Sequence, residues 1–159
     1  KRDGILMTVS KSGVITQLVR SSAPQALREW QSAASTNVVT GSVITGKSSE
    51  TAITQFSKTF TPTWTLRIAS TGQSKVTSLN GLTYLALTSK AAIAGISGWK
   101  PTMPTLLVIS FDSKGLMKGA YSFPGLVTPI ALVATRDGGV VGAASGSDSS
   151  VSIFRLGSR

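Results

Sequence analysis

The sequence contains neither cysteine nor histidine among its 159 residues. Without cysteine there are no disulfide bonds, thiolate metal sites or thiol catalysis. Without histidine the chain lacks the commonest general base near neutral pH and a frequent metal ligand, which excludes a Ser-His-Asp mechanism. We therefore expect a chain that is not an enzyme and that has no catalytic residues, no metal site and no cofactor.

Acidic residues are also scarce. Six Asp and Glu stand against sixteen Lys and Arg, which gives a formal net charge of +10. The charge makes an anionic polymer or glycan a candidate partner. The basic residues are spread singly along the chain, however, which favours a solvated surface over a binding patch. No recognition helix or zinc-finger spacing accompanies them, so nucleic acid ranks low among the partners.

Long apolar runs are missing too. The apolar segments, such as residues 126–134, are interrupted by Thr and Pro and fall short of the roughly 20 residues of a transmembrane helix. We expect no membrane span. The chain opens on Lys-Arg-Asp-Gly, inside an expected turn and without a start Met, so we expect a mature or excised piece of a longer product.

What the sequence does contain is repetition. Residues 14–17 (VITQ) recur as residues 52–55 (AITQ), and similar apolar strands begin at residues 106 and 151. The four starts are 38, 54 and 45 residues apart, a spacing typical of one four-stranded propeller blade per repeat. Serine and threonine make up more than a quarter of the chain, which suits short strands separated by polar turns.

Two dipeptides predict tight hairpins. Asn80-Gly81 and Asp137-Gly138 both suit a two-residue turn with positive φ at each position. Strands are predicted around these turns and along the rest of the chain, at residues 26–32, 38–44, 64–68, 76–79, 82–88, 106–111, 117–123, 130–135, 140–144 and 151–156. The order of strand, turn and strand leaves no room for crossover helices.

The predicted fold class is therefore all-β. We expect a β-propeller segment of about three and a half four-stranded blades, with a β-sandwich as the alternative. Residues 1–159 would form a single propeller domain or part of one. Its expected units are a half blade at residues 1–20 and blades at about residues 21–57, 58–111 and 112–157.

The hairpin and closing strand at residues 136–156, which end in SIFRL, and the segment LLVISFDSKG at residues 106–115 carry a resemblance. They resemble the repeat units of bacterial secreted β-propellers of the quinoprotein-like type, and the likeness covers most of the chain as a pattern. The resemblance implies a propeller fold and a location in the cell envelope or outside the cell. It implies no particular reaction.

Short patterns related to catalysis have structural explanations. Residues 97–100 match the Ser-x-x-Lys spacing of acyl enzymes, but the partner motifs of those enzymes are missing. Residues 41–48 end in Gly-Lys-Ser, but the upstream glycine is one position too close for a phosphate-binding loop, and a hairpin explains the glycines. Four of the six carboxylates fall in predicted turns, where Asp caps backbone N–H groups; the six are Asp3, Glu29, Glu50, Asp112, Asp137 and Asp148.

The aromatic residues give one candidate binding site. Trp30 and Trp64 fall in predicted strands, where we expect them to pack between sheets. Trp99 and Lys100 lie in the longest insertion, residues 91–104, and an exposed Trp beside a cation would suit contact with a partner.

Together these features predict a non-enzymatic binding or assembly scaffold, one part of a larger cell-envelope or secreted protein or complex. Its partners would be another protein or the remaining blades of the same propeller. Two alternatives stay open: a carbohydrate-binding or carbohydrate-processing propeller, and a basic subunit that binds an acidic polymer.

Overall fold

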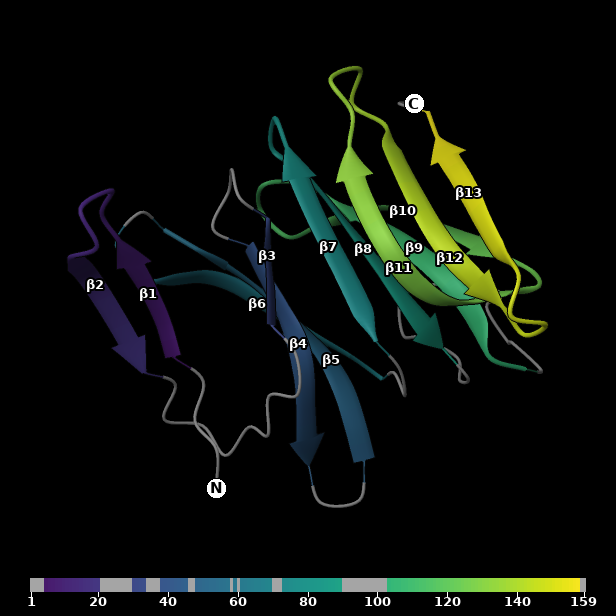
Figure 1. Cartoon of the computed structure of the whole chain (residues 1–159), viewed down its shortest axis with the longest axis horizontal. Helices are drawn as coiled ribbons and strands as arrows, with labels where there is room; N and C mark the ends of the chain where they lie inside the picture. Colours follow the sequence, from purple (N-terminus) through teal and green to yellow (C-terminus); the bar gives the residue numbers. More distant parts are fainter. Residues whose placement is uncertain are drawn as a thin grey trace.

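The computed structural model describes residues 5–20, 30–33, 38–45, 48–57, 59, 61–69, 73–89 and 103–157. These residues form β-strands joined by turns, which confirms the all-β class (Figure 1). In this part of the chain no helix has the length and apolar character needed to cross a bilayer.

The strands form one hairpin and three larger sheets, all antiparallel, in which strands adjacent in sequence lie side by side. Hairpin A pairs β1 (Ile5–Val9) with β2 (Ile15–Arg20). Sheet B contains β3 (Trp30–Ala33), β4 (Val38–Thr45), β5 (Ser48–Phe56) and β6 (Pro62–Ala69). Sheet C contains β7 (Ser74–Leu79), β8 (Leu82–Ser89), β9 (Thr105–Phe111) and β10 (Met117–Phe123). Sheet D contains β11 (Leu126–Ala134), β12 (Val140–Gly146) and β13 (Val151–Leu156).

The boundaries between sheets differ from the expected unit boundaries. The repeat predicts that units separate at residues 57/58 and 111/112, but β6 pairs with β5 and β10 pairs with β9 across those two points. In sheets B and C the recurring apolar strand is therefore the third strand and not the last. In sheets B and C the chain then turns back and adds a fourth strand, because a short turn keeps consecutive antiparallel strands together.

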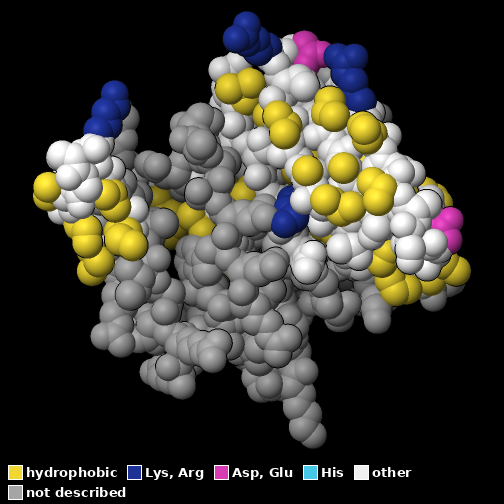
Figure 2. All heavy atoms as spheres, in the orientation of Figure 1, with side chains coloured by type: hydrophobic (Ala, Val, Ile, Leu, Met, Phe, Trp, Pro, Cys, Tyr) yellow, Lys and Arg dark blue, Asp and Glu magenta, His cyan; other side chains and the backbone are white. Residues whose placement is uncertain are grey.

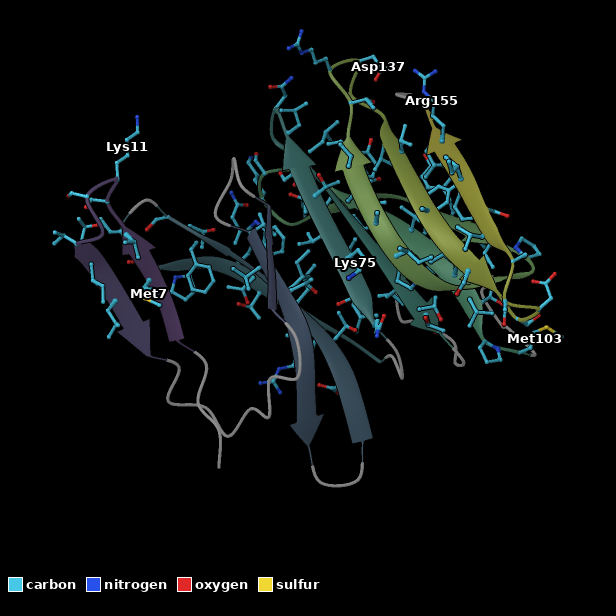
Figure 3. The ribbon with its side chains drawn as sticks, in the orientation of Figure 1. Met7, Lys11, Lys75, Met103, Asp137 and Arg155 are labelled. Carbon is cyan, nitrogen blue, oxygen red and sulfur yellow. The ribbon has the colours of Figure 1, made fainter. Side chains whose placement is uncertain are left out.

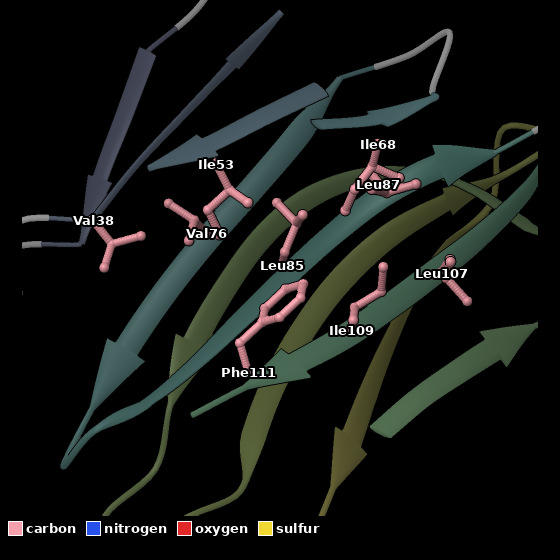
Figure 4. Close-up of a cluster of buried hydrophobic side chains, with 9 residues drawn as sticks. All are labelled: Val38, Ile53, Ile68, Val76, Leu85, Leu87, Leu107, Ile109 and Phe111. Carbon is pink, nitrogen blue, oxygen red and sulfur yellow. The ribbon is translucent and has the colours of Figure 1, made fainter. Parts of the chain in front are cut away.

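Sheet C lies between sheets B and D, so both of its faces are buried. One face packs against sheet B in a cluster that joins Val38 and Ile53 of sheet B to Leu85, Leu107 and Ile109 of sheet C (Figure 4). Further members of this cluster are Ile68, Val76, Leu87 and Phe111. Because both faces are covered, β8 and β9 are buried at almost every position instead of at alternating positions.

The other face of sheet C packs against sheet D. Here Ala86 and Val108 of sheet C share a cluster with Val140, Ala144 and Phe154 of sheet D. In sheet D only the face toward sheet C is buried, and β12 accordingly alternates between buried and half-buried positions.

Polar contacts connect sheet C to both of its neighbours. The Tyr84 hydroxyl donates to the Gly138 carbonyl at 2.6 Å, and the Thr88 hydroxyl donates to the Val127 carbonyl at 2.7 Å. On the other side, the Thr40 and Ser74 hydroxyls lie 3.1 Å apart. These bonds satisfy buried polar groups between the sheets, where an unpaired hydroxyl would be costly.

The two predicted hairpin turns have different geometries. Asn80 and Gly81 both have positive φ, 52° and 80°, as the two-residue turn requires. In the other turn only Gly138 has a positive φ, 81°, and its N–H donates to the Thr135 carbonyl at 3.0 Å. The expectation of positive φ at Asp137 is therefore wrong. The turn is a three-residue loop, a type I turn that ends in a glycine bulge.

Gly142 provides the space into which Phe154 fits. The two residues are cross-strand partners in sheet D, and a Cβ atom at Gly142 would overlap the Phe154 ring. The same ring lies 4.4 Å, centroid to centroid, from Phe123 of sheet C. Gly142 thus positions the aromatic side chain that joins the two sheets.

We predict that Gly142→Ala lowers the free energy of unfolding by about 1–3 kcal/mol, because the added methyl group must displace Phe154 from the interface. Gly157→Ala is the matched control, since a Cβ there meets no atom within 4 Å. Chemical denaturation of both variants measures the difference. Equal stability of the two variants would contradict the assigned packing.

Candidate functional site

The predicted partner-binding residues, Trp99 and Lys100, lie outside the described residues. The Ser-x-x-Lys pattern at residues 97–100 lies outside them as well. The role of this loop therefore stays a prediction.

The candidate phosphate-binding segment belongs to a hairpin. Residues 38–45 form β4 and residues 48–56 form β5, and these strands pair antiparallel from Val38 opposite Gln55 to Thr45 opposite Ser48. A phosphate-binding loop requires a strand followed by a helix. Gly41 lies in β4 of this hairpin, as expected, while Gly46 and Lys47 lie outside the described residues.

Asp112 stabilises the turn between β9 and β10. Its Oδ1 atom accepts hydrogen bonds from the Lys114 N–H at 2.9 Å and the Leu116 N–H at 3.0 Å. The Leu116 N–H is the main cause that lowers the pKa of Asp112. Ser57 takes the same role between β5 and β6, where its hydroxyl accepts from the Thr59 N–H at 3.2 Å and the Thr61 N–H at 3.1 Å.

Asp137 holds the turn between β11 and β12. The Thr135 hydroxyl donates to its Oδ1 atom, and Arg155 donates to its Oδ2 atom at 2.6 Å. The hydrogen bond from Thr135, followed by those from the Gly139 N–H and Arg155, lowers the pKa of Asp137. Figure 3 shows Asp137 and Arg155 at the same end of sheet D.

Asp148 completes the set in the turn between β12 and β13. The Ser150 hydroxyl donates to its Oδ1 atom at 2.6 Å and the Ser150 N–H at 3.0 Å; the hydroxyl is the larger cause of the lowered pKa of Asp148. The expectation that carboxylates cap turns is confirmed for these three Asp residues. Asp3 and Glu29 lie outside the described residues, and Glu50 lies on β5 with its Oε2 atom 4.0 Å from Arg67.

The carboxylates of the described residues do not cluster. Within the described ranges, no three Asp or Glu residues lie close enough together to hold a metal ion. Each of the three turn carboxylates is instead occupied by hydrogen bonds from its own turn or from Arg155.

Trp64 packs between sheets B and C, as expected. Its indole N–H donates to Gln55 Oε1 at 2.5 Å and lies 3.2 Å from the Ser113 carbonyl of sheet C. A Cβ atom at Gly115 would lie 2.7 Å from the Trp64 ring, so the glycine in this turn allows sheet C to approach the indole. Trp30 lies in β3, as predicted, and its packing stays a prediction.

The feature that sequence reasoning missed is an uncovered apolar surface on sheet D. We call it the outer face of sheet D. Its apolar side chains point away from the face that carries Phe154, and they are Ala131, Val133, Val141, Ala143, Val151 and Ile153. Val133, Val151 and Ile153 are among the most exposed large apolar residues described. Figure 2 shows hydrophobic side chains spread over this sheet.

A second exposed apolar surface lies on hairpin A. Met7 of β1 and Leu18 of β2 are cross-strand partners, and both side chains are exposed. Figure 1 places hairpin A and β13 at opposite ends of the molecule, and Figure 2 shows hydrophobic side chains gathered on the hairpin. Exposed apolar faces of this kind mark interaction surfaces in folded proteins.

A sequence signal for the outer face of sheet D did exist. In the strand VSIFRL, Ile153 and Phe154 are adjacent and must point to opposite faces. A strand with apolar residues on both faces is expected to be covered on both faces.

Comparisons of the chain with protein-family models and with curated proteins give no match.

We predict that acid destabilises the turns. Since the folded-state pKa values of Asp112, Asp137 and Asp148 lie below the ordinary value, their stabilising effect is present above the unfolded-state pKa. It is lost as the pH falls through the lowered folded-state values. The melting temperature should therefore decline below about pH 4.

The combined variant Asp112→Asn, Asp137→Asn and Asp148→Asn should show a smaller acid decline, because the groups that titrate have been removed. Thermal unfolding between neutral and acidic pH measures both curves. Asp112→Ala is the control. It removes the hydrogen-bond acceptor as well as the charge, so it should lower stability at neutral pH. An unchanged acid decline in the triple variant would show that other groups govern it.

Proposed function

We propose that this chain is a non-enzymatic assembly scaffold, built as a segment of a β-propeller. The observation that carries the proposal is the outer face of sheet D, an apolar sheet face exposed at one end of a stack of sheets. The scaffold works by covering that face with a partner. The scaffold provides a binding surface of complementary shape and does not catalyse a reaction.

The contacts between sheets support the propeller form over a sandwich. The backbone of β7, the first strand of sheet C, lies close to β3 and β4 of sheet B and to β11, the first strand of sheet D. In a propeller the first strand of each blade lies nearest the central axis, where neighbouring blades converge. Convergence of β3, β7 and β11 favours this arrangement.

The turn carboxylates support a structural rather than a catalytic use of the acidic residues. Asp112, Asp137 and Asp148 accept hydrogen bonds within their own turns. A general acid or base must be free to exchange its proton with a substrate, which these hydrogen bonds oppose. Together with the resemblance to secreted propellers, this supports a binding role in the cell envelope or outside the cell.

Trp99 and Lys100 are a second contact in this proposal. Their insertion joins β8 to β9, the two central strands of sheet C, and such connections are frequent places for binding residues.

The absence of cysteine allows a direct test. Ile153→Cys places a single thiol on the outer face of sheet D, and Ser147→Cys places one in the exposed turn before β13 as a matched control. Maleimide labelling reports whether each thiol is accessible. We predict that, in the native assembly isolated under gentle conditions, the thiol at position 153 is labelled several-fold more slowly than the thiol at position 147.

After the assembly is dissociated into folded single chains, the two thiols should react at similar rates. If the thiol at position 153 is already as reactive as the control thiol in the isolated native material, the outer face of sheet D is not covered and the scaffold proposal is wrong.

A further inference from the structure

Aligned at their last residues, Phe56, Phe111 and Leu156, the third strands of sheets B, C and D carry cross-strand pairs at equivalent positions. Ile53 lies opposite Thr40, Val108 opposite Ala86 and Ile153 opposite Ala143. Ile53 and Val108 are both 0% exposed, because the next sheet in the stack covers them, whereas Ile153 is 79% exposed. At equivalent positions, sheet D therefore exposes the surface that sheets B and C bury.

A second position shows the same pattern. Two residues before those just named stand Thr51, Leu106 and Val151. Thr51 is 1% exposed and Leu106 is 0% exposed, whereas Val151 is 64% exposed. The outer face of sheet D is thus equivalent to an established sheet-to-sheet interface and differs from it in lacking a cover.

The structure also shows what kind of surface provides such a cover. Sheet D covers sheet C with the face that carries the cross-strand partners Val140 and Leu156. Sheet C covers sheet B with the equivalent pair, Thr83 and Phe111. The apolar member of each pair lies three residues after the outward-facing residue, Leu156 after Ile153 and Phe111 after Val108.

Hairpin A carries a covering pair of this kind in an exposed state. Its register, in which Val9 pairs with Ile15 and Thr8 with Gln17, matches that of β9 and β10, in which Phe111 pairs with Met117 and Ser110 with Gly119. The pair Met7 and Leu18 thus corresponds to Ile109 and Ala120, which belong to the packing of sheet C on sheet B. Met7 and Leu18 are 52% and 57% exposed, and Figure 3 shows Met7 on the hairpin, far from sheet D.

We infer that the outer face of sheet D binds the Met7 and Leu18 face of hairpin A in a second copy of this chain. The inference rests on the proposed scaffold function and names its partner. The contact would repeat the packing of sheet C on sheet B, with Met7 and Leu18 in the places of Ile109 and Ala120.

Such a contact is head to tail, because it joins two different surfaces of the same molecule. Contacts of this type generate a ring when the rotation between copies closes and a filament when it does not. A ring is the outcome that matches a propeller, since closed propellers have about four to eight blades.

Cross-linking between single-cysteine variants tests the contact. Equal amounts of a Met7→Cys chain and an Ile153→Cys chain are mixed, unfolded and refolded together, and treated with a short bis-maleimide. A product that contains one of each chain can form only between copies, because the natural chain has no cysteine. We expect this mixed product to exceed the two products that join like chains.

The matched control is Lys11→Cys, which places the thiol in the turn of hairpin A, away from the Met7 and Leu18 pair (Figure 3). Lys11 is also exposed, so accessibility alone would allow a thiol there to react. The inference requires that the Lys11→Cys chain gives little product with the Ile153→Cys chain. Equal yields from the Met7→Cys and Lys11→Cys chains would overturn the assigned face.

The mass of the purified chain in solution gives an independent test. We expect a mass of at least two copies for the natural sequence, falling to that of a single chain for Ile153→Lys. Val133→Lys, on the same outer face in β11, should have the same effect. Circular dichroism of each variant checks that the strands remain folded.

A natural chain that is a folded monomer at all concentrations would overturn the second-copy inference. Slow labelling of the Ile153→Cys thiol in the native assembly would then still support the scaffold proposal and indicate a different polypeptide as the cover. Rapid labelling of that thiol in the native assembly would overturn both.

Discussion

The burial of both faces of sheet C is the constraint on which the rest of the structure depends. Leu85, Leu107 and Ile109 face sheet B, while Ala86 and Val108 face sheet D. Each large side chain so buried contributes on the order of 1.5–3 kcal/mol, and neither neighbouring sheet could supply both covers. The order of the stack, with sheet C in the middle, follows from this requirement.

The polar residues at the start of several turns stabilise those turns. Ser10, Ser57 and Asp112 accept hydrogen bonds from backbone N–H groups of their own turns. Most acidic residues of the described strands and turns serve this local purpose. The excess of Lys and Arg is left for the solvent, where repulsion between chains of high net charge opposes indiscriminate association.

Much of the fold could be predicted from the sequence because its strand signals are local. The Asn80-Gly81 turn, the apolar runs of β8 and β9 and the turn positions of three Asp residues each depend on a few adjacent residues. The limits of the sheets could not be predicted in this way, since β6 and β10 join the preceding sheet by pairing alone. The type of turn at Asp137 could not be predicted either, because a type I turn with a bulge and a two-residue turn both favour Asp-Gly.

The candidate site was harder to predict than the fold. A composition search finds residues with chemistry, such as Trp99 and Lys100, whereas the outer face of sheet D consists largely of ordinary alanine, valine and isoleucine. Nothing in the residue type of Ile153 distinguishes it from Ile53. Only the stacking of the sheets shows that one is buried and the other is not.

This difference between equivalent positions has a physical consequence for the repeat. A repeat that buries one face of each sheet against the next always leaves an unlike face at each end. At positions that the internal sheets bury, sheet D and hairpin A keep apolar residues: Ile153 occupies the position of Val108, and Met7 that of Ile109. Capping units of repeat proteins carry polar outer faces, so the apolar residues kept at these positions resemble those of internal sheets, which supports the proposal that a further sheet continues the stack.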